Sequence, residues 1–402
     1  MSEHGLLTVE IAGTKEYGSA EDALPLSLST ESPRPQQRKR WLVTAGVVIC
    51  ICVLGPLNGV LFKIMYTAYG ERSAMFCSTM VNFIYCLYGG LALFLVRNKV
   101  TPSMWATPQR KFAIMGGLDC LAGFLTAIAA YGTPGTWQVL LNQGIVPLTM
   151  LAAVIFLGKK SSTVQWLGSA TIMAGSVVVL APSFLRGDSD LSLVSSILFF
   201  SSNIPFAASW TYKEVNFKGP DRVHVVFLTQ CVSCYQFLLG LLLLPLQQLP
   251  FSGSREGMTV SETVSSFVQG WYCFLEVNAE CQKGQAWLLL LGYCLVNFVY
   301  NTAGLFLVKR ESARFNAVVA AVILPINVLV FNLPALGSFT EPFHMETITG
   351  LIVVTVGFFL WKLDNLVIGE QYVEPSTNYS PLSERSQEAF YERSVALVTI
   401  NK

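Results

Sequence analysis

Asn142-Gln143-Gly144-Ile145-Val146-Pro147 opens a long apolar stretch of the sequence, and Ala321-Val322-Ile323-Leu324-Pro325 opens another one further along. Each stretch is followed by two glycines seven residues apart, Gly168 and Gly175 in the first case and Gly350 and Gly357 in the second. The chain therefore reads as two copies of one unit. Two copies with a broken or bent helix at the same place are typical of a membrane transporter.

The composition places most of the chain in a lipid bilayer. Of the 402 residues 52% are hydrophobic and only 13% are charged, and the mean hydropathy is +0.52. Soluble globular domains carry about 25% charged residues. The net charge of +1 indicates no polyanionic partner, and no stretch combines clustered basic and aromatic side chains as a nucleic-acid surface does. The sequence predicts an all-α polytopic membrane protein that binds no nucleic acid.

Apolar runs near the ~20 residues that a spanning helix needs recur along the chain. The runs cover residues 41–66, 74–96, 111–131, 136–157, 163–181, 192–213, 223–248, 286–308, 312–334 and 345–363. Ten runs divide into a first five-helix repeat over 41–181 and a second over 192–363. Residues 1–40 and 364–402 are polar, and we expect both to be disordered.

The basic residues indicate the orientation. If the N-terminus is cytosolic, sixteen Lys and Arg residues flank the spans on the cytosolic side and four on the other. Both termini are then cytosolic, and five spans per copy make the two repeats inverted. We therefore expect ten transmembrane helices arranged as two inverted five-helix repeats around a central cavity.

The long loop 249–285 falls on the non-cytosolic side in this topology. Thr259 and Glu262 have the spacing of a capping box. Val260, Val264, Phe267 and Val268 would share one face of the short helix that follows, which could lie on the membrane surface or pack against the protein. On this oxidising side we expect a disulfide between Cys273 and Cys281.

No catalytic or cofactor motif occurs. The sequence has no Walker loop, no GxSxG and no HExxH, and its three histidines lie near or outside the expected membrane edges. Cys231 and Cys234 form a CxxC inside an expected span without a second pair, so helix packing is the preferred interpretation. We expect neither an enzyme nor a metal or cofactor site.

Asp119 is the clearest ionisable group inside an expected span. Such residues are expensive in the bilayer and point to function by default. Asp119 would attract a cation or take up a proton with its pKa raised by desolvation, or it would bond structurally to a neighbouring helix. Lys63 and Lys213 lie near span ends, where we expect their side chains to reach the headgroups.

Amides and prolines cluster in the same spans. Prolines free backbone carbonyls, which only protein or a water-filled cavity can satisfy at this depth. Amides beside such breaks suit a neutral or zwitterionic substrate, although each could instead bond between helices. The predicted substrate-binding residues are Asn58, Asp119, Gln143, Asn203, Asn297 and Asn301, and the predicted helix-break or gating residues are Pro56, Pro147, Pro205 and Pro325.

With these residues laid out, the chain resembles the chloroquine-resistance transporter family of the drug/metabolite transporter superfamily. The resemblance covers roughly residues 41–363. It is carried by Leu118-Asp119 with Thr133, Gly135, Gln138 and Gln143–Pro147, by the segment from Asn58 to Lys63, by Ile204-Pro205 with Lys213, and by Gln236, Asn301, Pro325 and Gly350.

The resemblance implies ten spans, inverted repeats, a central cavity, two juxtamembrane helices and a disulfide-bearing loop on the vacuolar side. It also implies export of amino acids, peptides or cationic drugs from acidic vacuoles, or of thiols from plastids. The sequence departs from the family in having one candidate loop disulfide instead of two, and Gly59 where some members carry a lysine.

We therefore expect a secondary transporter of a vacuolar or endolysosomal membrane, with a small-molecule substrate, protons and the lipid bilayer as partners. One alternative is a thiol or nucleotide-sugar exchanger of another organelle. The acidic residues before position 40 speak against plastids, and the lack of a lysine pair inside the ninth span speaks against nucleotide sugars. An alternative of another class is a non-transporting receptor or scaffold, which the matched proline-containing repeats disfavour.

Overall fold

The computed structural model describes ten stretches of the chain. They are residues 35–70, 73–130, 132–133, 135–158, 161–186, 193–218, 223–245, 259–277, 285–340 and 345–367. Of the ends expected to be disordered, 1–40 and 364–402, residues 1–34 and 368–402 lie outside these stretches, whereas residues 35–40 and 364–367 are helical. The first part of the long loop and Cys281 also lie outside them. The chain divides into two units, Met1–Leu42 and Val43–Lys402, and every contact given below lies within the second.

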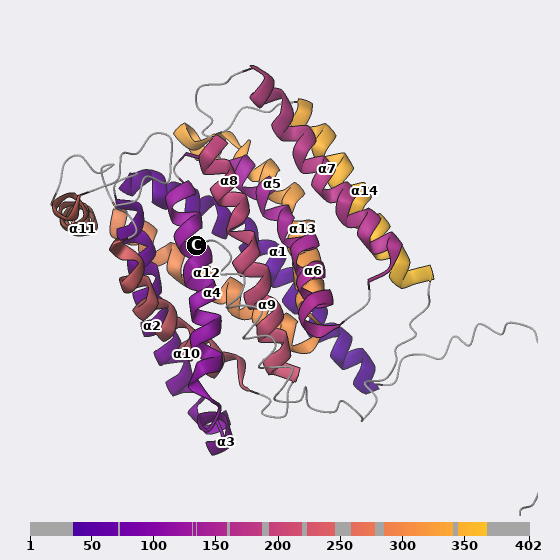
Figure 1. Cartoon of the computed structure of the whole chain (residues 1–402), viewed down its shortest axis with the longest axis horizontal. Coiled ribbons are helices and arrows are strands. Elements are labelled where there is room, and N and C mark those ends of the chain that lie inside the picture. Colours follow the sequence, from indigo (N-terminus) through magenta and orange to yellow (C-terminus); the bar gives the residue numbers. More distant parts are fainter. Residues whose placement is uncertain are drawn as a thin grey trace, which may run out of the picture. The chain divides into compact units, whose positions relative to one another are not determined.

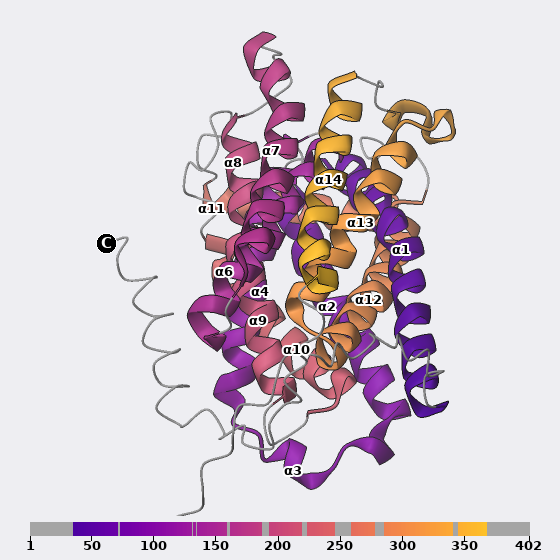
Figure 2. The ribbon, with the colours of Figure 1, turned by 90° about the vertical axis from the view of Figure 1, so that its right-hand side faces the viewer.

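The described residues form helices and connecting turns, with no strand among them (Figures 1 and 2). The elements are α1 Pro35–Tyr69, α2 Ala74–Leu95, η2 Arg97–Lys99, α3 Pro102–Trp105, α4 Gln109–Ala130, α5 Gly135–Leu141, η3 Asn142–Gly144, α6 Ile145–Leu157, α7 Thr163–Arg186, α8 Leu193–Ser201, α9 Asn203–Lys218, α10 Val225–Leu243, α11 Val260–Phe274, α12 Ala286–Arg310, α13 Ala313–Phe331, η5 Pro334–Phe339 and α14 Met345–Val367.

Six helical stretches in the described part of the chain are long and apolar enough to cross a membrane. They are Trp41–Tyr69, Ala74–Leu95, Gln109–Ala130, Trp137–Leu157, Val225–Leu243 and Ala286–Arg310. The expected sixth span is instead two helices of 9 and 16 residues, α8 and α9, each shorter than a membrane crossing requires. The protein is therefore an all-helical, multi-pass membrane protein.

Two of the expected spans are interrupted, and the interruptions meet. The quoted stretch Asn142–Gly144 forms the single 3₁₀ turn η3 between α5 and α6, and Ser202 forms a turn between α8 and α9. The side-chain nitrogen of Asn203 donates to the carbonyl oxygen of Leu141 at 3.1 Å and to that of Phe200 at 3.0 Å. One amide therefore satisfies a backbone carbonyl at each interruption.

The expectation of a helix break at every proline is wrong for two of the four. Pro147 and Pro205 each lie in the first turn of the helix after an interruption, where a missing N–H is tolerated. Helix α1 continues through Pro56 and α13 through Pro325. A proline there removes one hydrogen bond, whereas a full interruption would expose several backbone groups, so the helix persists.

The repeated glycines bring α7 and α14 into direct backbone contact. A Cβ atom on Gly168 would lie 2.6 Å from the backbone nitrogen of Trp361, and one on Gly175 would lie 2.9 Å from the carbonyl oxygen of Gly350. Because later residues of α7 meet earlier residues of α14, the two helices run antiparallel, as Figure 1 shows. The glycine spacing read from the sequence is thus a helix-packing motif.

A second pair of helices, α2 and α10, also packs antiparallel. The rings of Phe83 and Phe237 are 5.5 Å apart, and Gly89, further along α2, lies against Gln230, earlier in α10. Aromatic and aliphatic side chains of α1, α2 and α12, including Met65, Phe76 and Leu290, form the largest buried cluster beside this pair.

Helix α11 begins with the expected capping box, in which Thr259 and Glu262 bond reciprocally. Its predicted apolar face is divided. Phe267 packs into the buried cluster, with its ring 5.9 Å from that of Phe76, whereas Val260, Val264 and Val268 are exposed. Because α11 packs against α2, the face that the sequence predicts as one apolar surface is buried at Phe267 and exposed at the three valines. Cys273 is buried, and its pairing with Cys281 stays a prediction.

We predict that Gly168→Ala will destabilise the protein, because the added methyl meets backbone atoms of α14 that cannot rotate away. The expected cost is about 1–3 kcal/mol, seen as a lower midpoint of thermal unfolding in detergent. Gly292→Ala in α12 is the matched control, since no atom lies within 4 Å of that Cβ position. Equal midpoints for the two variants would contradict the packing described here.

Candidate functional site

Helices of the second unit enclose a cavity of about 380 Å³. Its walls come from α1, α2, α4, the α5–α6 segment, α8, α9, α10, α12 and α13. None of the described side chains of α7 and α14 lines it. Cavities of about 300–1,000 Å³ hold small organic molecules, so this volume suits a metabolite-sized ligand.

All six predicted substrate-binding residues line this cavity. They are Asn58, Asp119, Gln143, Asn203, Asn297 and Asn301. Pro56, Pro147 and Pro205 do not line it, the side chain of Pro325 lies outside what the structure describes, and the gating role predicted for all four stays a prediction. The lining includes eight asparagines and three glutamines, so amides are its most frequent polar side chains.

Asn203 and Gln143 hold the backbone around the helix interruptions. Both are buried, with 1% and 4% of their surface exposed. Asn203 donates to the two carbonyls already described, and the side-chain nitrogen of Gln143 donates to the carbonyl oxygen of Val139 at 3.1 Å. Both N–H groups of Asn203 and one of the two of Gln143 are therefore committed to the fold.

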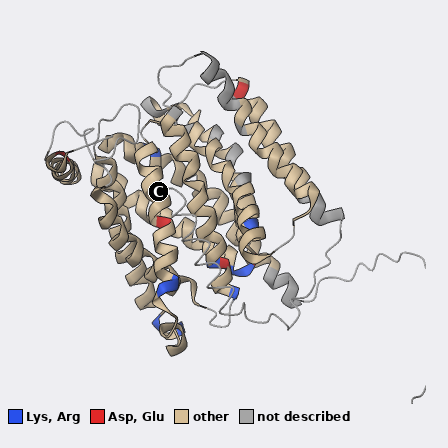
Figure 3. Ribbon diagram, in the orientation of Figure 1, with Lys and Arg blue, Asp and Glu red and all other residues tan. Residues whose placement is uncertain are grey.

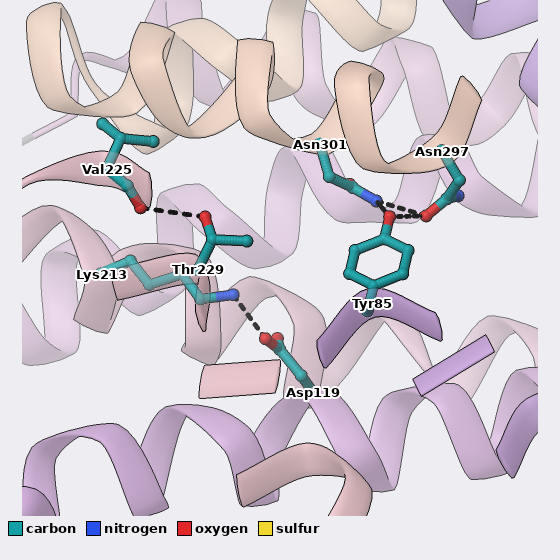
Figure 4. Close-up of polar contacts among 7 residues, drawn as sticks. All are labelled: Tyr85, Asp119, Lys213, Val225, Thr229, Asn297 and Asn301. Atoms are coloured by element: carbon teal, nitrogen blue, oxygen red, sulfur yellow. Dashed lines mark hydrogen bonds and ion pairs between the residues drawn. The ribbon is translucent and has the colours of Figure 1, made fainter. Parts of the chain in front are cut away.

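Asn297 and Asn301 form the centre of a hydrogen-bond network at the cavity wall (Figure 4). The hydroxyl of Tyr85 donates to the side-chain oxygen of Asn297 and accepts from the nitrogen of Asn301 at 2.9 Å. Asn297 donates in turn to the side-chain oxygen of Asn58 at 2.8 Å and to the hydroxyl of Tyr293 at 3.0 Å. The network joins α1, α2 and α12.

The tyrosines of this network were not among the predicted site residues. Tyr293 precedes Asn297 by one helical turn, so the 3.6-residue period could have placed it on the same face. Tyr85 lies in α2, whose approach to α12 no local pattern reveals. The part of the network on α12 could therefore be predicted from the helical period, whereas the contact with Tyr85 depends on tertiary packing.

Lys213 lies in the cavity wall, contrary to the expectation that it reaches the headgroups. Its Nζ donates to Oδ2 of Asp119 at 2.6 Å, and 5% of Lys213 and 7% of Asp119 is exposed. In Figure 4 the two side chains point at each other from α9 and α4. Lys213 can lie in the cavity wall because Asp119 pairs with it; an unpaired ammonium or carboxylate at this burial would cost several kcal/mol.

Lys63 is also held by the protein. Its Nζ donates to the carbonyl oxygen of Thr133 at 3.0 Å, beyond the end of α4. The carbonyl lies just past a helix C-terminus, where cations are favoured. Lys63 therefore anchors the connection between α4 and α5 and does not line the cavity.

Glu214, the residue after Lys213, serves the fold. It is fully buried and faces α13, where its Oε2 accepts from the backbone N–H of Ala313 at 2.9 Å and its Oε1 from Lys218 at 2.8 Å. A carboxylate at a helix N-terminus satisfies a free N–H and interacts favourably with the helix dipole. Neighbouring residues of α9 thus place one charge in the cavity and one at a helix end.

We predict that Tyr85→Phe will weaken the network at the cavity wall. The variant leaves Asn297 and Asn301 with one partner fewer each, at a cost of about 1–2 kcal/mol measured by thermal unfolding in detergent. Tyr88→Phe is the control, because that hydroxyl lies 3.5 Å from its acceptor, the carbonyl of Leu291, and should matter by less than about 0.5 kcal/mol. Equal losses would show that the Tyr85 hydroxyl makes no special contribution.

Comparison with known proteins places this chain in a family. The family model described as CRT-like, chloroquine-resistance transporter-like, matches residues 43–361. Crt homolog 1 of Dictyostelium discoideum is 28% identical over 369 residues, which cover 83% of this chain and 77% of that protein.

Two further relatives come from distant organisms. The chloroquine resistance transporter of Toxoplasma gondii is 31% identical over 65% of this chain, which matches 31% of that longer protein. Protein CLT1, chloroplastic, of Arabidopsis thaliana is 27% identical over 77% of this chain and 70% of its own length. The resemblance read from the sequence is confirmed: the chain belongs to the CRT-like, chloroquine-resistance transporter-like family.

Proposed function

We propose that this protein is a secondary transporter that moves small organic solutes, such as amino acids, small peptides and cationic drugs, from an acidic vacuole or lysosome to the cytosol. The observation that carries the proposal is the amide-rich cavity, which lies inside an otherwise apolar set of helices and is lined by both repeats. A receptor or scaffold has no need of such a cavity, since burying so many polar side chains in a membrane protein is costly.

The proposed architecture is ten spans in two inverted repeats, 41–181 and 192–363, that rock around the cavity in alternating access. Inverted repeats require corresponding helices to cross the membrane in opposite directions. The antiparallel packing of α2 with α10 and of α7 with α14 supports this arrangement. The Lys and Arg residues gather toward the end of the helices where α3 lies, which supports a cytosolic assignment for that end (Figure 3).

The second candidate is an exchanger of thiols or nucleotide sugars in another organelle. The chloroplastic relatives in Arabidopsis thaliana favour a different compartment. Among the described lining residues Asp119 and Lys213 alone are charged, so their charges balance. A multiply anionic nucleotide sugar would need an excess of basic groups, which makes solutes of low net charge the preferred substrates.

The transport proposal predicts that the amides of the cavity determine uptake. The purified protein in proteoliposomes with an acidic donor compartment should transport members of a labelled mixture of amino acids and dipeptides. Asn297→Leu should lower the rate at least tenfold, because it removes the centre of the polar wall. Asn98→Ala in the exposed turn η2 should leave the rate unchanged. Transport that ignores Asn297, or no transport of any solute, would contradict the proposal.

Proton coupling through Asp119 is a separate prediction. Asp119→Asn should abolish the dependence of uptake on an imposed pH gradient, because the amide cannot take up and release a proton. Uptake driven by substrate concentration alone, measured at equal pH on both sides, reports whether the variant still folds and binds. Unchanged pH-driven uptake in this variant would remove Asp119 from the coupling mechanism.

A further inference from the structure

The cavity contains one acid and one base, and they bind each other. Asp119 on α4 and Lys213 on α9 are the charged residues among its described lining, and 2.6 Å separates Nζ of Lys213 from Oδ2 of Asp119. A ligand that carries an ammonium group must therefore find its counter-ion already occupied. The group that occupies Asp119 is the ammonium group of Lys213.

The carboxylate is only half satisfied by this partner. Its second oxygen, Oδ1, is buried and makes no hydrogen bond within the described part of the chain, although a carboxylate can accept several. About 10% of the Asp119 side chain is exposed. Oδ1 itself is covered in the empty protein, so the ammonium group of a ligand must displace the side chains over it and then meets an acceptor with no partner among the described residues.

Lys213 also has a second interaction partner, the ring of Trp210. Its Nζ lies 5.2 Å from the centre of the Trp210 ring, which is one helical turn earlier on α9 and also lines the cavity. The face of an indole attracts an ammonium group. The four-carbon stem of a lysine is flexible enough to move between a carboxylate and such a ring. The displaced ammonium therefore remains partly stabilised.

We propose that Lys213 is a built-in competitor that occupies Asp119 when the cavity is empty and yields it to the ammonium group of a ligand. The proposal rests on the proposed function, since it takes the cavity to be the ligand site. It makes Lys213 a specificity-determining residue. The empty cavity carries no unpaired charge, so the unloaded protein can change conformation without exposing a bare carboxylate to the membrane interior.

A purely structural ion pair between α4 and α9 is the competing explanation. A structural pair holds two helices together whatever enters the cavity. A competitor sets the apparent affinity of the cavity for cations, and this affinity should rise when the competitor is weakened and fall when it is strengthened. The two explanations therefore differ in the response to an added cation and not only in stability.

The test measures binding of a cation to the purified full-length protein in detergent. n-Butylammonium is the probe, and the neutral n-butyramide is its matched control. Thermal unfolding midpoints are recorded over a series of probe concentrations for wild type, Lys213→Gln and Lys213→Arg. Glutamine leaves the carboxylate without a competing charge, whereas arginine can hold a carboxylate through two parallel hydrogen bonds.

The expected order of apparent affinity for n-butylammonium is Lys213→Gln, then wild type, then Lys213→Arg, with about tenfold between neighbours. n-Butyramide should affect the three proteins equally. If Lys213→Gln cannot be purified, the comparison of wild type with Lys213→Arg decides, because the arginine pair keeps both charges. Equal responses, including no response in any of the proteins, would overturn the proposal.

This experiment separates the inference from the transport proposal. Binding is measured without a membrane gradient, so the graded order supports the role of Lys213 even where proteoliposomes transport nothing. Conversely, transport that depends on Asn297 together with equal n-butylammonium affinities would leave the proposed function intact and remove only the competitor role.

Discussion

The side-chain amide of Asn203 is the interaction on which the cavity depends. Lipid offers no hydrogen bonds, so two helices can be interrupted inside a membrane protein only where something satisfies the freed carbonyls. Asn203 does this for Leu141 and Phe200 together, because it lies where the two interruptions meet. The interruptions in turn let Gln143, Asn203 and Asp119 share one cavity. The polar interior thus follows from how a backbone is satisfied in an apolar solvent.

Much of the helical organisation could be predicted from composition and periodicity. The apolar runs place the helices, and the paired residues Asn297 and Asn301 share a face because of the helical period. The network with Tyr85 and the pair Asp119–Lys213 join helices that lie far apart in sequence, so no local pattern indicates them. Lys213 illustrates the limit: its position near a span end favours the headgroups, and only a partner on another helix reverses that preference.

The four prolines also show that a residue type alone does not determine where a helix is interrupted. All four lack an N–H, yet α1 and α13 continue through Pro56 and Pro325, whereas the interruptions before Pro147 and Pro205 coincide with Gly144 and Ser202 and with the Asn203 amide. A proline permits a helix interruption, and a nearby hydrogen-bond donor stabilises the interruption by satisfying the freed carbonyls. In the proposed division into two five-helix repeats, the two interrupted segments fall in different repeats, at positions that do not correspond.

The contact of α7 with α14 also constrains how the two halves can move. The two helices fall in different proposed repeats, none of their described side chains lines the cavity, and Gly168 and Gly175 leave no side chain between the backbones. Surfaces pressed together at backbone distance cannot slide past one another without clashes, but they can turn about the line of contact. In the proposed alternating access, the contact between α7 and α14 would therefore be the axis about which one half turns against the other.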